Sequence, residues 1–106
     1  MGSTLSQLQL LQQNLQSLLS QKQQIENQLT EINSAITETQ GTDKVYKIIA
    51  GIMVAVPPEK AARELKEKKD FFQIRLKNFN GQEERLKQNI EKIQQEVIEE
   101  LKNKKK

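Results

Sequence analysis

The sequence predicts a mainly α-helical protein: one long antiparallel coiled-coil hairpin with a short β-hairpin at its bend. Three observations lead to this fold: two long heptad repeats, a β-branched segment between them, and a low share of apolar residues. Of 106 residues, 35% are hydrophobic and 29% are charged. A compact globule loses roughly 1–2 kcal/mol of backbone entropy per residue on folding, which so few apolar residues would not offset. A helical pair buries only one seam, so we expect a single elongated domain over residues 1–106.

The first expected helix covers residues 6–39, which contain no Pro or Gly. Its apolar residues recur in alternating steps of three and four, the heptad repeat of a coiled coil. The repeat positions are Leu8, Leu11, Leu15, Leu18, Ile25, Leu29, Ile32 and Ile36, with Lys22 in the remaining one. One face of this helix should therefore lie along a partner.

A second repeat predicts a helix over residues 58–103, followed by a basic tail over 104–106. Its positions are Ala62, Leu65, Lys69, Phe72, Leu76, Phe79, Glu83, Leu86, Ile90, Ile93 and Val97. Pro58 and Glu59 suit the first helical turn. Gly81 inside the helix costs about 1 kcal/mol relative to Ala and marks a candidate bend.

Residues 44–56 predict two short strands, because β-branched residues gather there and the helical period is lost. The apolar residues of this ribbon are Tyr46, Ile48, Ile49, Ile52, Met53, Val54 and Val56. A lone two-stranded hairpin is marginally stable in water and leaves its edges open. We therefore expect these residues to join chains into an oligomer; the alternative is a ribbon folded back on its own helices.

The two helical repeats match when the chain folds back at residues 50–51, so that paired residue numbers sum to 101. Leu15 then faces Leu86, and the same rule pairs Ile49 with Ile52 in the ribbon. Helices and strands thus require one register, and agreement between levels strengthens the prediction.

Three layers of the seam carry a charge: Lys22 with Phe79, Leu18 with Glu83, and Ile32 with Lys69. Because Lys22 and Glu83 lie in adjacent layers, we expect that they can pair. Two interpretations remain open. The lysine stems either extend past the seam towards water, or the polar layers fix the register at a cost in stability.

Composition argues against several function classes. The chain has no Cys and no His, so disulfides, thiolate metal sites and the commonest general base are missing, and we expect neither an enzyme nor a cofactor. No stretch approaches the roughly 20 apolar residues of a membrane span, and we expect a soluble cytoplasmic protein. Lysines alternate with Glu and form no basic stripe with aromatic residues, which disfavours nucleic acid as a partner.

The run Val45-Tyr46-Lys47-Ile48-Ile49-Ala50-Gly51-Ile52-Met53-Val54 resembles the hairpin of β-class prefoldin subunits, especially archaeal ones. Further stretches also resemble these subunits: the run Glu59-Lys60-Ala61-Ala62-Arg63-Glu64-Leu65-Lys66-Glu67-Lys68 and the short motifs Arg75-Leu76 and Gln82-Glu83-Glu84. A single hairpin is typical of the β class. The chain departs from the family at Ala50, where Gly is usual, at Pro57-Pro58 and at Gly81.

The resemblance implies an ATP-independent chaperone, a hexamer of two α-class and four β-class subunits joined through their hairpins. It also implies that the coiled-coil tips bind unfolded proteins and deliver them to a group II chaperonin. The expected tip residues are Leu5, Leu8, Leu11, Leu15, Ile93, Val97, Ile98 and Leu101. In the register above, residue 5 pairs with 96, so Val97 and later residues should have little partner.

The lysines expected to contact the chaperonin are Lys102, Lys104, Lys105 and Lys106, although a solvated tail is the alternative. Three rival functions remain: a structural or tethering coiled coil without chaperone activity, a nucleic-acid-binding coiled coil, and a hairpin inserted in a membrane interface. Deleting residues 97–106 should impair suppression of aggregation and spare assembly if the tips bind clients.

Overall fold

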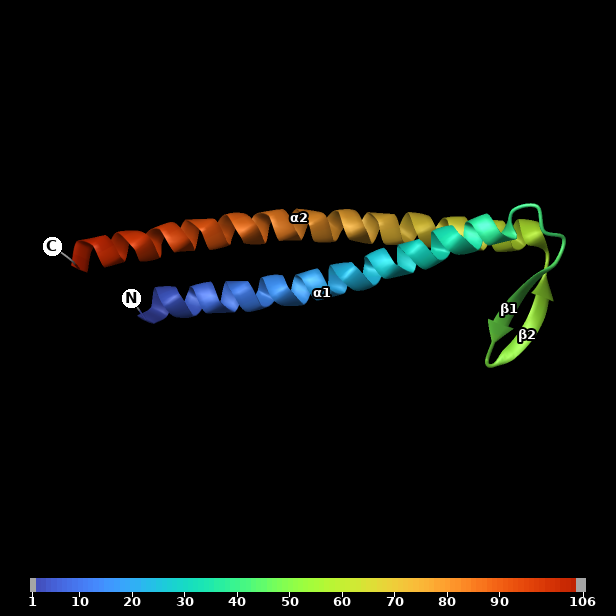
Figure 1. Cartoon of the computed structure of the whole chain (residues 1–106), viewed down its shortest axis with the longest axis horizontal. Coiled ribbons are helices and arrows are strands. Elements are labelled where there is room, and N and C mark those ends of the chain that lie inside the picture. The colour runs from blue at the N-terminus through green and yellow to red at the C-terminus, as the bar shows by residue number, and fades with distance from the viewer. Residues whose placement is uncertain (1, 105–106) are drawn as a thin grey trace. The chain divides into compact units, whose positions relative to one another are not determined.

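The computed structural model describes residues 2–104, in the order α1 (Gly2–Thr39), β1 (Val45–Ile49), β2 (Ile52–Val56) and α2 (Pro58–Lys104) (Figure 1). The predicted fold class, two long helices with a β-hairpin between them, is confirmed. The described residues form two compact units. The hairpin unit is residues 24–76, and the terminal unit is residues 2–23 with 77–104.

Helix α1 begins at Gly2, earlier than the expected residue 6. It ends at Thr39, after which the backbone N–H of Gln40 donates to the Thr37 carbonyl at 3.3 Å. Gly41 follows with a φ of 73°, a left-handed conformation that glycine adopts readily and that commonly ends helices.

The strands pair antiparallel, with Val45 opposite Val56 and Ile49 opposite Ile52. This confirms the predicted strand register. The two turn residues, Ala50 and Gly51, have φ values of 49° and 81°. Two positive values are typical of the type I′ turn of a two-residue hairpin loop. Ala50 is strained by roughly 1–2 kcal/mol in this region, because its Cβ approaches the following carbonyl oxygen.

Helix α2 begins directly after the ribbon. The Pro57 carbonyl accepts the first helical hydrogen bond, from the Ala61 N–H at 3.1 Å. Pro58 is the first helical residue, where its missing N–H costs nothing. Glu59 lies in the first turn, where its negative charge complements the helix dipole.

At the first turn of α2 the burial differs from the prediction: Ala61 is buried, whereas the expected seam residue Ala62 is exposed, although it lines a hollow with Ile36 and Thr39 of α1. The reason lies in the ribbon. Ala61 and Leu65 line a small hollow of about 170 Å³ together with Val45 and Val56 from the base of the strands. The first turn of α2 therefore faces two elements: Ala62 lies beside α1, and Ala61 lies beside the base of the ribbon.

Every other repeat position in both units is buried or half-buried, which supports the predicted heptads. The most buried apolar side chains are Ile25, Leu29, Ile32 and Ala61 in the hairpin unit, and Leu18 and Ile90 in the terminal unit. Full burial of such an aliphatic side chain contributes roughly 1.5–3 kcal/mol. The seam is therefore the core of each unit.

Candidate binding surfaces

A group of exposed large apolar side chains lies on the ribbon, whose turn stands clear of the helices of the hairpin unit (Figure 1). We call it the ribbon surface: Tyr46, Ile48, Ile49, Ile52, Met53 and Val54, all exposed. Ile48 is 71% exposed, more than any other large apolar side chain described. Val56, the seventh expected residue, is half-buried because it lies at the base of the ribbon.

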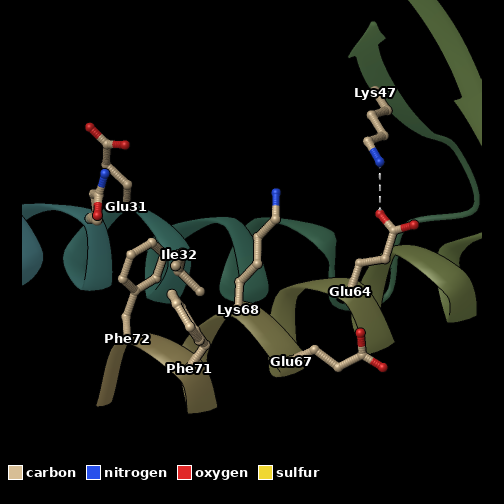
Figure 2. A pocket seen from close by; sticks show the side chains of 9 residues that line it. Glu31, Ile32, Lys47, Glu64, Glu67, Lys68, Phe71 and Phe72 are labelled. Atoms are coloured by element: carbon tan, nitrogen blue, oxygen red, sulfur yellow. Dashed lines mark hydrogen bonds and ion pairs between the residues drawn. The ribbon is translucent and has the colours of Figure 1, made fainter. Parts of the chain in front are cut away.

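One face of the ribbon is turned towards α2. Because side chains alternate along a strand, Val45 and Lys47 share a face, and Val45 is half-buried at the base. Lys47 Nζ lies 3.2 Å from Glu64 Oε2 and donates a hydrogen bond to it (Figure 2). This bond lowers the pKa of the Glu64 carboxyl below its ordinary value. Strand and helix are thus tied by an ion pair as well as by apolar contact.

A groove of about 640 Å³ adjoins this ion pair in the hairpin unit (Figure 2). Its lining residues are Gln28, Glu31, Ile32, Lys47, Glu64, Glu67, Lys68, Phe71 and Phe72. The Phe71 and Phe72 rings meet edge to face, with centroids 5.4 Å apart. The guanidinium of Arg75 lies 5.8 Å from the centre of the Phe71 ring, in a cation–π arrangement.

Phe71 is 56% exposed and Ile74 is 62% exposed, and the sequence-based prediction missed both. A signal was present, since neither residue occupies a heptad position although both are apolar. An apolar side chain outside the repeat should have been identified as a candidate surface residue.

The terminal unit contains a polar layer in its seam. Lys22 Nζ lies 2.8 Å from Glu83 Oε1, and Lys87 Nζ lies 2.8 Å from Glu83 Oε2. The prediction that Lys22 and Glu83 can pair is therefore confirmed. Hydrogen bonds from Lys22 and then Lys87 lower the pKa of Glu83 from 4.5 to about 2. In the hairpin unit Lys69, the other charged lysine of the repeat, is half-buried.

At the end of the terminal unit, Thr4 Oγ1 donates a hydrogen bond of 3.1 Å to Glu100 Oε1. Val97 and Glu100 are half-buried. The expectation that Val97 and later residues have little partner is thus wrong for these two. The reason is that α1 extends back to Gly2, so its first turns are available to cover the end of α2.

The expected tip residues separate into two sets. Those on the seam are half-buried: Leu8, Leu11, Leu15, Ile93 and Val97. Those off the seam are exposed: Leu5, Ile98 and Leu101. Leu10, which is 58% exposed, lines a groove of about 340 Å³ with the half-buried Leu11 and Ile93. Among the expected tip residues, the second set is therefore the one exposed to another molecule, and Leu10 and Leu19 of the same unit are exposed as well.

Of the expected tail lysines, Lys102 is exposed on α2 and Lys104 is the last residue of that helix. Lys105 and Lys106 lie outside the described residues. Within residues 2–104, no helix has the length and apolar character needed to cross a membrane. In that same range no three acidic side chains come together in a way that could hold a metal ion.

Comparison with known proteins agrees with this architecture. The prefoldin subunit family model matches residues 3–104. Prefoldin subunit beta of Archaeoglobus fulgidus is 38% identical over 95 residues, covering 87% of this chain and 82% of the relative. Prefoldin subunit beta of Pyrococcus furiosus is 35% identical over 96 residues, covering 88% and 82%.

The crystal structure of the prefoldin beta subunit from Thermococcus strain KS-1 superposes with a TM-score of 0.85 at 32% identity. The superposition covers 91% of this chain and 87% of the Thermococcus chain. The extent of these matches spans both helices and the ribbon. The chain therefore belongs to the prefoldin subunit family and resembles its β class.

Proposed function

We propose that the chain is a subunit of an ATP-independent cytoplasmic holdase that binds unfolded proteins at the end of its terminal unit. The observation that carries this proposal is the set of exposed apolar side chains off the seam: Leu5, Leu10, Ile98 and Leu101. A side chain that closed the coiled coil would be covered. These four remain open beside a seam that is already complete.

Small, separate apolar sites of this kind suit weak contacts with many partners, because each contact buries little area and requires no particular shape. The groove beside Leu10 also carries Lys92 and Glu96, so an apolar segment with either charge nearby finds a counter-ion. Such binding needs neither a cofactor nor nucleotide hydrolysis.

The ribbon surface is the proposed site of assembly. A two-stranded sheet with apolar side chains on both faces and two open edges needs cover from other strands. We propose that hairpins of further β-class copies and of α-class subunits supply this cover, in a hexamer of two α and four β.

The test compares two matched double variants of the assembled complex. Leu5→Gln/Leu101→Gln removes tip area, and Phe71→Gln/Ile74→Gln makes the same kind of change on exposed side chains of the hairpin unit. We expect the tip variant to lose most suppression of aggregation of a heat-denatured client, measured by light scattering. The control should keep it, and both should keep their assembled mass.

Full suppression by the tip variant would overturn the proposed client site. If the unmodified complex assembles but does not suppress aggregation of the client, the structural or tethering alternative is favoured. These point substitutions are cleaner than deletion of residues 97–106, because Val97 and Glu100 belong to the seam.

Delivery to a group II chaperonin is proposed to involve the basic end of α2. Lys102 and Lys104 lie in its last turn, and Lys105 and Lys106 follow in the sequence. Changing all four to Glu should weaken capture of the complex by an immobilised chaperonin, and added salt should weaken capture of the unmodified complex. Equal capture of both forms would instead support a solvated tail.

A further inference from the structure

The ribbon carries one charged residue among the ten residues of its strands, and that residue is Lys47. Its position opposite Val54 places it in the middle of the sheet, between apolar neighbours. An ammonium there must reach water or an acceptor, and it reaches Glu64 on α2. An apolar residue at position 47 would leave the ribbon without this polar link to the helix.

Glu64 has other cations nearby on its own helix. Lys60 and Lys68 lie one turn before and one turn after it, and both lower its pKa by their charge. The hydrogen bond nevertheless comes from Lys47, which is the largest cause of the lowered pKa. The carboxylate is therefore directed towards the strand rather than along the helix.

The remaining contacts of the ribbon lie at its base. Val45 and Val56 are half-buried near Ala61, and Pro57 alone connects β2 to α2. Beyond them, most of the ribbon is exposed. Contact at the base forms a pivot, and a second contact further along a rigid sheet fixes its direction. Lys47, two residues along β1 from Val45, supplies that second contact.

We propose that Lys47 and Glu64 are positioning residues that set the angle of the β-hairpin on α2 and so select which face other subunits cover. The inference rests on the proposed assembly through the ribbon surface. The face that carries Lys47 is held towards α2. The opposite face, with Tyr46, Ile48, Met53 and Ala55, is offered to a second copy. On the Lys47 face, Val54 is exposed as well, and so are Ile49 and Ile52, which lie beyond the ion pair beside the turn.

The angle can be measured directly because the chain has no Cys. Spin labels at Ile52→Cys on the ribbon and Asp70→Cys on α2 report it, with labelled chains diluted in unlabelled ones so that only distances within one chain are seen. We expect a single narrow distance distribution. Lys47→Met and Glu64→Gln should each raise the population of other angles about two- to fivefold, the range for an exposed ion pair.

The exchange Lys47→Glu/Glu64→Lys should restore the narrow distribution in labelled chains. In chains without labels at Ile52 it should restore the assembled mass. Lys44→Met and Lys60→Met are matched controls, and neither should change the distribution. Lys44 lies three residues before Lys47 in the chain and Lys60 lies one turn before Glu64, whereas the hydrogen bond to Glu64 comes from Lys47. An unchanged distribution in Lys47→Met, or an exchange that restores nothing, would overturn the proposal. If the unmodified chain fails to assemble with any subunit, the proposed function fails, while the distances still report on the ion pair.

Discussion

The hairpin unit and the terminal unit follow the same heptad rule and use it differently. In the hairpin unit the rule buries Ile25, Leu29 and Ile32. In the terminal unit it places Lys22 and Glu83 in the seam, joined by an ion pair. In both units the large exposed apolar side chains lie outside the repeat. Position in the heptad, more than hydrophobicity, thus decides whether an apolar residue stabilises the fold or is left for a partner.

The largest effect is expected on the ribbon, whose exposed apolar side chains we assign to assembly with other subunits. Ile48→Lys/Met53→Lys places two charges on its outward face, and we expect assembly to be lost while helix content is kept, because neither residue touches the seam. Light scattering gives the mass and circular dichroism the helicity. Leu10→Lys, at a site in the terminal unit that is 58% exposed, should leave the mass unchanged. An assembly that survives the double variant would exclude this face from the interface.

The next largest effect is a difference in unfolding free energy between replacement of a seam residue and replacement of a surface residue. Ile25, only 4% exposed, should lose about 2–4 kcal/mol of unfolding free energy on replacement by Ala, through lost burial and a cavity. Leu10→Ala, at an exposed site, should change it by less than about 0.5 kcal/mol. Urea unfolding followed by circular dichroism measures both. Similar losses at the two sites would mean that heptad position does not decide burial.

A smaller effect is expected at the polar layer of the terminal unit. Lys22→Leu/Glu83→Leu should raise the melting temperature by a few degrees, because a partly covered ion pair is replaced by apolar contact. It should also loosen the register, seen as a broader spin-label distance between Leu15→Cys and Leu86→Cys. A double variant that melts lower would show that the pair stabilises the fold, and an unbroadened distance would show that it does not fix the register.

The smallest expected effect is a dependence of the melting temperature on acidic pH. The pKa of Glu83 is lowered from 4.5 to about 2 in the folded chain, so the stability from its ion pairs is present above pH 4.5 and lost as pH falls towards 2. We expect the melting temperature to decline across that window. Glu83→Gln should flatten the decline, and high salt should reduce it. A Gln variant with the same acid profile would place the dependence on other carboxylates.

Much of the architecture could be predicted because it depends on local periodicity. The repeats of Leu and Ile determine both helices and their buried faces, and the β-branched run determines the ribbon between them. The strand register followed from the same arithmetic, since a chain that folds back about one short turn has its pairing set by that turn. Pairing of Lys22 with Glu83 followed because their layers are adjacent.

Only the tertiary structure shows which side chains of separate elements meet, because this depends on the direction in which those side chains point. Sequence spacing could not show that the base of the ribbon covers Ala61 in place of Ala62, or that Lys47 turns to Glu64. Nor could it show that Thr4 reaches Glu100, 96 residues away. A heptad specifies which face of a helix is buried. It does not specify which strand lies against the first turn of that helix, or which cation reaches the helix's carboxylates. Both are known only once the two elements are placed in space.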